Sequence, residues 1–202
     1  MKLALASSLL PLLAAAAPTS NSAATEQPAA FTVLAARSAS PIHYATLNAR
    51  GQSFWLGGNT TSYCPLQSGC PAGNTTVLAG NGAALSTVVP GGQQIYVAPS
   101  GALKFTQAHS ANIPPGSSYG PFAYEAGSPD QVFGYYTYKG WGADGFMACP
   151  TEPEAEYSPD NEWQVFAALQ NATVPSGDVN DCLGFSALAV PTNQTGAAWQ
   201  YI

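Results

Sequence analysis

Glycine and proline interrupt this chain so often that long helices are hard to place. The 202 residues include 20 glycines and 17 prolines, with short apolar runs between them. Runs rich in Val, Ile, Thr and aromatic residues, bounded by turn signals such as Pro90-Gly91-Gly92, are typical of β-strands. We expect helical turns only at 165–170 and around Ala187. The expected strands are 31–36, 42–47, 53–57, 75–79, 85–89, 94–98, 103–107, 122–125, 132–138, 145–149, 162–167 and 183–190.

Regularly spaced strands without intervening helices predict a single antiparallel all-β domain over residues 31–202. About twelve strands favour a β-trefoil-like closed barrel, in which three four-stranded units meet. Echoes such as Phe54-Trp55-Leu56-Gly57 and Gly101-Ala102-Leu103 favour this fold, although they keep no fixed period. A β-sandwich is the alternative.

The first 17 residues have the pattern of a secretory signal peptide. Lys2 is followed by a short apolar run and by four alanines, and the run is too short to span a bilayer. No later segment is apolar and long enough to span one. Residues 18–30 are small, polar and proline-bearing, which predicts a disordered lead-in. We therefore expect a soluble, exported protein.

Sequons and cysteines agree with export. Four Asn-x-Thr sequons mark Asn59, Asn74, Asn171 and Asn193 as expected N-glycosylation sites. An even number of cysteines suits two disulfides in an oxidising compartment. We expect the pairs Cys64–Cys70 and Cys149–Cys182, although four cysteines allow three pairings. The spacing contains no CxxC and the chain has only two histidines, so a zinc site is not expected.

The charge balance excludes several classes of partner. Lys plus Arg number 5 and Asp plus Glu number 11, which gives a formal net charge of -6. Neutralising phosphates requires a basic surface, so neither a nucleic acid nor an anionic membrane is an expected partner. The 46% hydrophobic content leaves enough apolar surface for a folded core.

The candidates for catalysis all have simpler interpretations. The motif Gly116-Ser117-Ser118-Tyr119-Gly120 matches G-x-S-x-G, but it stands between prolines without a strand-to-helix turn, so we interpret it as a glycine-rich loop. His43 and His109 are expected to be structural. The acidic stretch is expected to be solvated charge on a loop, and comprises Glu152, Glu154, Glu156, Asp160 and Glu162. We therefore expect no catalytic residue, no cofactor, no metal and no enzymatic activity.

Aromatic residues are the remaining candidates for binding. In an extended strand, Phe133 and Tyr135 would face one side, while Tyr136 and Tyr138 would face the other. We expect the second pair to be exposed, with Trp141 nearby, as a surface for wall polysaccharide, because sugar rings stack on aromatic faces. Burial of both tyrosines in the core is the alternative. Trp55 and Trp163 are interpreted as core anchors.

Several short segments stand in a characteristic order along the chain: 31–43, Tyr63-Cys64-Pro65, 90–97, 100–103, Ala148-Cys149-Pro150, 163–167 and 181–185. Taken in this order, they resemble fungal secreted cell-wall proteins of the PhiA type, the phialide and conidium development proteins. The likeness is greater to the IgE-binding branch of that group. It covers roughly residues 31–190, and Cys70 and the acidic insert at 151–162 depart from it.

This resemblance implies a non-catalytic secreted or cell-wall glycoprotein that acts in asexual sporulation and in protection against stress. IgE binding and an allergen property are implied by the resemblance alone. No catalytic residue is carried over from the family. The alternative function is a lectin-like module that binds wall polysaccharide through Tyr136, Tyr138 and Trp141.

Overall fold

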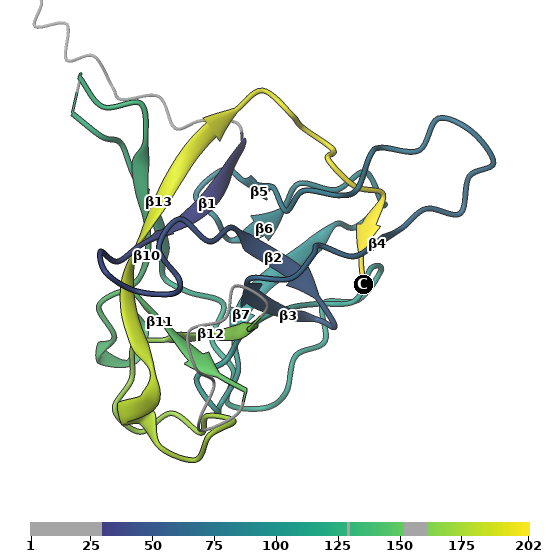
Figure 1. The fold of residues 1–202 in the computed structure, drawn as a ribbon. Helices are drawn as coiled ribbons and strands as arrows, with labels where there is room; N and C mark the ends of the chain where they lie inside the picture. Colours follow the sequence, from purple (N-terminus) through teal and green to yellow (C-terminus); the bar gives the residue numbers. More distant parts are fainter. Residues whose placement is uncertain (1–29, 129, 152–160) are drawn as a thin grey trace, which may run out of the picture.

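In the part of the chain that the structure describes, β-strands make up nearly all of the regular structure (Figure 1). These residues form fourteen strands. The computed structural model describes residues 30–128, 130–151 and 161–202. In these residues the helical segments are two three-residue 3-10 turns, η1 (Gly140–Gly142) and η2 (Val179–Asp181). The all-β prediction is confirmed. The strands are β1 (Ala30–Ala36), β2 (Leu47–Arg50), β3 (Ser53–Leu56), β4 (Ser62–Tyr63), β5 (Leu78–Ala79), β6 (Ala84–Leu85), β7 (Gln93–Val97), β8 (Leu103–Phe105), β9 (Phe122–Glu125), β10 (Gly134–Tyr138), β11 (Phe146–Pro150), β12 (Trp163–Ala167), β13 (Leu183–Thr192) and β14 (Gln200–Tyr201).

Twelve of these strands form one sheet, and its hydrogen bonding returns to its starting point. The order is β1-β5-β6-β7-β8-β3-β12-β11-β13-β10-β9, with β2 added on β3. Because β13 also pairs with β1, the strands from β1 to β13 form a ring. All the pairs between these strands are antiparallel. The trefoil-like closed barrel and the sandwich both stay predictions.

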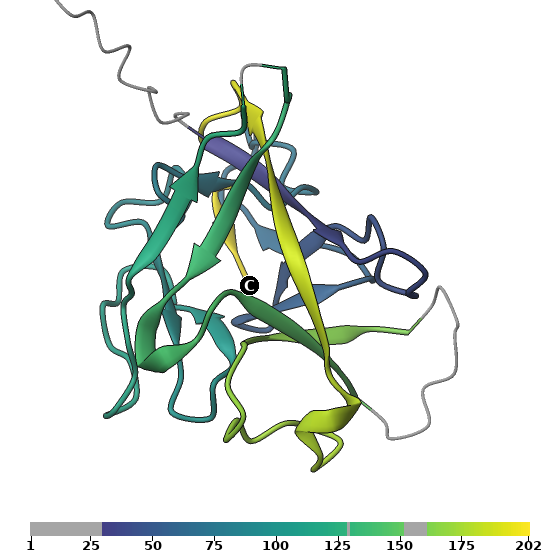
Figure 2. The ribbon, with the colours of Figure 1, turned by 90° about the vertical axis from the view of Figure 1, so that its left-hand side faces the viewer.

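Strand β13 joins three parts of this sheet. Figure 2 shows it as the long yellow strand beside the purple β1 and the green β10. Its first residues pair with β11, and its remaining residues pair with β1. In its middle, Ala187 and Ala189 lie between β1 on one side and β10 on the other. Both alanines are buried, so small side chains occupy the part of β13 where β1 and β10 flank it.

The core follows from strand alternation. In β1, Phe31, Val33 and Ala35 are buried while the residues between them are half-buried, as a two-residue period requires. Large aromatic side chains fill much of the interior, including Phe54 and Phe105, whose ring centroids are 5.4 Å apart. A second apolar cluster surrounds Cys149, Phe166 and Tyr96.

Within the described residues, no helix is long and apolar enough to cross a bilayer.

A small second sheet, β4 with β14, is tied to the main sheet by several hydrogen bonds, including those of one buried amide. Gln93 at the start of β7 donates from Nε2 to the carbonyl oxygens of Thr106 (2.9 Å) and Tyr201 (3.0 Å). Its Oε1 accepts from the Tyr201 N–H at 2.7 Å. Gln93, Thr106 and Tyr201 are all buried, so these hydrogen bonds fix β14 against β7 and the end of β8.

Both expected disulfides are present, and they lie in different settings. Cys64 and Cys70 close a loop of sequence separation 6 directly after β4. Cys149 and Cys182 have a separation of 33, and Cys149 is fully buried. In the β11–β13 register, Ala148 faces Leu183, so the Cys149–Cys182 bond stands at the next position of this antiparallel ladder. The described residues contain no free cysteine.

Several strand boundaries differ from the predictions. Within the segment 42–47, residues 42–44 lie in a turn, because the His43 N–H bonds to the Ser40 carbonyl oxygen and Tyr44 has a positive φ of 62°. The strand in this region is β2, which begins at Leu47. Ala30, expected in the lead-in, is the first residue of β1 and is fully buried. The helical turns expected at 165–170 and near Ala187 were wrong, since Val165 lies in β12 and Ala187 in β13.

Other expected strands are shorter than predicted. Only Leu78–Ala79 of 75–79 and Leu85 of 85–89 are in strands, and β4 and β14 were not predicted at all. The expected signal peptide, residues 18–29 of the expected lead-in and the carboxylates Glu152, Glu154, Glu156 and Asp160 lie outside the described residues.

Candidate functional site

The aromatic strand β10 alternates as expected, but its faces were assigned the wrong way round. Tyr136 is 3% exposed and Tyr138 is fully buried, whereas Tyr135 is 38% exposed. The prediction that Tyr136 and Tyr138 bind glycans at the surface is therefore wrong. The physical reason is that their face of β10 meets the aromatic interior, where Tyr136 packs against Phe122 and Phe146.

The Tyr136 ring is also fixed by its hydroxyl. The Oη atom donates to the Gly82 carbonyl oxygen at 2.8 Å. A Cβ at Gly82 would lie 2.2 Å from the Tyr136 ring, and Gly82 has a positive φ, so a glycine is required there. Burial raises the pKa of Tyr136 well above its usual value. This tyrosine is a packed, neutral core residue.

Trp141 is exposed, as predicted. It is the middle residue of η1, and its side chain is 49% exposed. Its φ of 54° lies in the left-handed region, which costs free energy for a residue other than glycine. Its ring meets the buried Tyr138 edge-on, with centroids 6.4 Å apart. An exposed indole is thus held in place by a strained turn and by the ring beneath it.

Trp141 lines a surface cavity of about 250 Å³. The cavity is also lined by residues of two loops, one at Pro99–Gly101 and one at Leu169–Ala172, and by Gly116. The two loops are in close contact, since a Cβ at Gly101 would lie 3.0 Å from the Ala172 Cβ. The Thr173 N–H also donates to the Ser100 carbonyl oxygen at 2.8 Å. The cavity combines an aromatic ring, aliphatic groups and the amide of Asn171, which is the chemistry that sugar rings require.

The four sequon asparagines, Asn59, Asn74, Asn171 and Asn193, are all exposed. Their threonines differ in burial. Thr76 of the Asn74 sequon is 2% exposed, and its Oγ1 accepts from the Ala49 N–H at 2.7 Å. The same Oγ1 is 2.7 Å from the hydroxyl of Thr60. By contrast, Thr173 and Thr195 are exposed.

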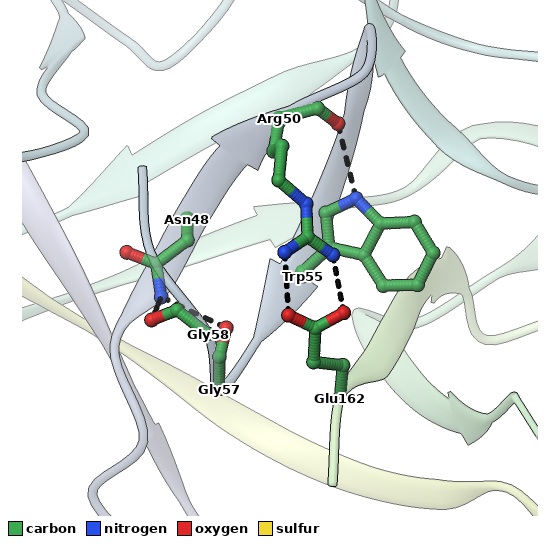
Figure 3. Close-up of polar contacts among 6 residues, drawn as sticks. All are labelled: Asn48, Arg50, Trp55, Gly57, Gly58 and Glu162. Atoms are coloured by element: carbon green, nitrogen blue, oxygen red, sulfur yellow. Dashed lines mark hydrogen bonds and ion pairs between the residues drawn. The ribbon is translucent and has the colours of Figure 1, made fainter. Parts of the chain in front are cut away.

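A polar cluster that the sequence reasoning missed joins β2, β3 and β12 (Figure 3). Arg50 and Glu162 form a bidentate ion pair, with side chains 33% and 30% exposed. The Arg50 guanidinium also lies 5.2 Å from the centre of the Trp55 ring, and the Trp55 Nε1–H donates to the Arg50 carbonyl oxygen at 3.0 Å. Trp55 is half-buried and Trp163 is buried, so the expected anchoring role fits Trp163 better.

The electrostatics of this pair oppose acid catalysis. The hydrogen bond and the charge of Arg50 lower the pKa of Glu162, and the same contacts with Glu162 raise the pKa of Arg50. A general acid needs a raised carboxyl pKa. Next to the pair, the Asn48 Nδ2 donates to the carbonyl oxygens of Gly57 (3.1 Å) and Gly58 (3.3 Å). The arrangement is one that fastens neighbouring strands.

A sequence signal for this cluster existed. Residues 47–56 read as two apolar-rich strands around Gly51-Gln52, which is typical of a hairpin. In the observed pairing, Arg50 faces Ser53 and Asn48 faces Trp55. The hairpin would have placed Arg50 near Trp55, but Glu162 is 112 residues away, and its contact depends on the pairing of β12 with β3.

The two histidines lie in separate settings. His43 is exposed, its Nδ1 accepts from the Arg37 N–H at 3.2 Å, and its ring stacks on Tyr44. His109 is exposed, has a positive φ of 61°, and lines a cavity of about 380 Å³ with Gln52 and Gln107. No side-chain carboxylate lines this cavity among the described residues.

The serine of the G-x-S-x-G match lies in a loop. Ser118 pairs with Val97 in an isolated β-bridge. Its Oγ donates to the Gly120 carbonyl oxygen at 2.6 Å and is 3.3 Å from the Gly120 N–H. The hydroxyl is therefore engaged with its own loop. Within residues 30–128, 130–151 and 161–202, no group of three or more His, Cys, Asp or Glu side chains could hold a metal ion.

Comparison with known proteins adds the family. The model of the PhiA-like secreted protein family matches residues 31–202. This chain belongs to that family. The PhiA-like resemblance stated from the sequence motifs is thereby confirmed, and the match extends through β14 to the last residue.

A relative from the fungus Arthroderma benhamiae (strain ATCC MYA-4681 / CBS 112371) supports the same assignment. It is described as "Uncharacterized secreted protein" and is 45% identical to this chain over 197 residues. The alignment covers 96% of this chain and 95% of the relative. No solved structure matches this PhiA-like chain.

Proposed function

We propose that this PhiA-like protein is a non-catalytic glycoprotein of the fungal cell wall. It acts in asexual development, in the formation of phialides and conidia, and in protection against stress. The family and the relative are both described as secreted, which supports delivery to the wall. The remaining support comes from the stability of the exported body and from the state of its reactive groups.

The observation that carries the proposal is the ring of strand pairing, closed by β1 and β13 and covalently linked beside β11. Proteases cut chains that open locally, so paired strand edges and a buried disulfide slow digestion. A low charge content of 8% and four exposed sequon asparagines suit a body that is coated with glycans in an extracellular matrix. These properties are what a long-lived wall component requires.

The reactive groups support a non-catalytic role. Glu162 is paired with Arg50, the Ser118 hydroxyl bonds within its own loop, and the Nδ1 of His43 accepts from the backbone. Each group is engaged in a contact that fixes a turn or a strand. We therefore place the working part of the protein at its surface.

Fractionation of fungal walls tests the location. Walls are extracted first with detergent and then with glucanase, and each fraction is probed with an antibody to the chain. The proposal predicts that most of the protein stays with the wall in detergent and is released by glucanase. Recovery from the culture medium alone would contradict the wall location.

Deletion of the gene in a sporulating fungus tests the developmental role. The proposal predicts fewer conidia and greater sensitivity to wall stress. The full chain should restore both, and a matched control chain without residues 2–17 should restore neither, because it would not be exported. Normal conidiation in the deletion strain would contradict the role.

A lectin-like function is the second candidate, and the exposed Trp141 favours it. Retention on chitin or β-glucan that is lost in Trp141→Ala would support it, while no retention on either polymer would count against it. We favour a different occupant for the Trp141 cavity, one that is attached to the chain itself.

A further inference from the structure

We propose that the N-glycan of Asn171 folds back over Trp141, so that its first sugar occupies the cavity between η1 and the 169–172 loop. The inference rests on the part of the proposed function that makes the protein an exported glycoprotein. It involves the Asn171 sequon and the Trp141 ring, and it assigns the cavity to the first sugar of the chain's own N-glycan.

The attachment point lies in the cavity wall. Asn171 is the first residue of Asn171-Ala172-Thr173, and it lines the same cavity as Trp141. Asn171 and Thr173 are both exposed, so the sequon stands on an open loop. The loop is fixed at its base, because the Thr173 N–H donates to Ser100 and the Ala172 N–H donates to Leu169. A sugar on Asn171 would therefore start from a defined position.

The receiving surface is an indole that is rigidly presented. Trp141 is 49% exposed although its φ of 54° is unfavourable for a tryptophan. A Cβ at the preceding Gly140 would lie 2.2 Å from the Tyr138 hydroxyl oxygen, so a glycine is needed for the turn to sit this close to the core. An exposed aromatic ring binds sugar through its apolar C–H face, which covers the ring and displaces water.

The space suits one sugar. The cavity of about 250 Å³ is below the usual range of about 300–1,000 Å³ for drug-sized ligands, and fits a single N-acetylated sugar ring better than an extended polysaccharide. Pro99 and Leu169 supply apolar walls. The other three sequon asparagines do not line this cavity.

The modification is a transfer of an oligosaccharide in the secretory pathway. The side-chain nitrogen of Asn171 bonds to the anomeric carbon of an oligosaccharide carried on a lipid diphosphate. The bond from that carbon to the diphosphate oxygen breaks, the lipid diphosphate leaves with the bonding electron pair, and the amide nitrogen releases one proton to the solvent. The sugar is then tethered one side chain away from the Trp141 ring.

The experiment uses the full chain secreted from a fungal host. Thr173→Ala removes the sequon and keeps Asn171, while the matched control Thr173→Ser keeps the sequon. A second control, Asn193→Gln, removes the glycan of a sequon outside the cavity. The two measurements are the glycan occupancy of Asn171 and the rate of hydroxyl-radical labelling of Trp141, both by mass spectrometry of peptides.

We expect Asn171 to be occupied and Trp141 to be labelled several-fold faster in Thr173→Ala than in the parent chain. Thr173→Ser and Asn193→Gln should label like the parent chain. In Trp141→Ala, an amidase that removes N-glycans should release the Asn171 glycan faster than from the parent chain, to the rate seen at Asn193.

Three results would overturn the inference: an unoccupied Asn171, equal labelling of Trp141 with and without the sequon, or binding of free β-glucan or chitin through Trp141 in the glycosylated chain. None of these results would contradict the proposed location in the wall. Conversely, recovery of the protein from the medium alone would contradict the proposed wall role, but it would not contradict the covering of Trp141 by the Asn171 glycan.

Discussion

The regions around the two disulfides are stabilised in different ways. Cys149–Cys182 extends the β11–β13 ladder inside the second apolar cluster and spans a separation of 33 residues that includes β12. Cys64–Cys70 closes an exposed loop of separation 6, which begins after β4. The Cys149–Cys182 bond connects parts of the core, whereas the Cys64–Cys70 bond restrains a short surface loop.

The exposed loop depends on something else for its position. The strand before the loop, β4, pairs only with β14 among the described strands. Two of the three Gln93 hydrogen bonds hold β14 at Tyr201, and the Tyr201 hydroxyl is bonded to Thr75 and Val77. Buried hydrogen bonds at β14, those of Gln93 among them, can therefore matter more for the position of this peripheral loop than the covalent bond within it. Four variants test this difference between the two regions.

The largest effect should come from removing the buried bond. Chain-entropy arguments give about 4 kcal/mol for a closed loop of this length. We expect Cys149→Ala with Cys182→Ala to lower the free energy of unfolding by about that amount, measured by denaturant titration. A loss below about 1 kcal/mol would mean that the ladder and the apolar cluster suffice without the bond.

Replacement of Gln93 should come next. Gln93→Leu leaves the Tyr201 N–H and the carbonyl oxygens of Thr106 and Tyr201 without this partner in a buried place. Each buried group left unsatisfied costs about 1–3 kcal/mol, so we expect a loss of about 3 kcal/mol. Amide hydrogen exchange should also increase in β14 and β4 while β11 and β13 stay protected; uniform exchange throughout the chain would contradict the local role.

Removal of the exposed bond should cost less. The same chain-entropy argument gives about 2 kcal/mol for the short loop, and its surroundings add little packing. We expect Cys64→Ala with Cys70→Ala to destabilise the chain by no more than this in the same titration. A larger loss than that from the Cys149 and Cys182 pair would reverse the comparison.

The smallest effect should come from the ion pair at the start of β12. Arg50 lowers the pKa of Glu162, so the pair stabilises the folded chain above the ordinary glutamate pKa of about 4.3 and loses this effect as the pH falls through the lowered value. For a partly exposed pair we expect Glu162→Gln to cost up to about 1 kcal/mol at pH 7.

The pH dependence identifies the cause. The difference in unfolding free energy between the parent chain and Glu162→Gln should shrink below about pH 4. Glu125→Gln is the matched control, because Glu125 pairs with Lys139 at an exposed position and should leave stability unchanged. A difference that persists at low pH would show that packing, and not charge, is lost.

Much of the fold could be predicted because its turns carry local signals. Pro90-Gly91-Gly92 correctly predicted the start of a strand, and β7 begins at Gln93. The strand expected at 42–47 was wrong because the apolar residues of this segment have the pattern of a strand. The turn depends on the left-handed conformation of Tyr44, which cannot be predicted from the residue type. Strands of two residues, such as β4 and β14, are too short to give a periodic signal.

The candidate site was predicted only in part. Alternation correctly separated Tyr135 from Tyr136, but the choice of the exposed face depends on Phe122 and Phe146, which approach from other strands. Trp141 could be chosen because it lies in η1, shortly after the end of β10. Trp141 and Asn171 line the same cavity although they are 30 residues apart, so no local sequence pattern predicts that they share it.

The most direct test of the central claim, that a stable exported body works through its surface, is the conidial yield of a deletion strain that carries chosen variants. We predict that the triple variant His43→Ala, His109→Ala, Ser118→Ala restores the wild-type yield. The variant Cys149→Ala with Cys182→Ala should restore much less. Failure of the triple variant, when it is folded and present in the wall at the wild-type amount, would contradict the claim.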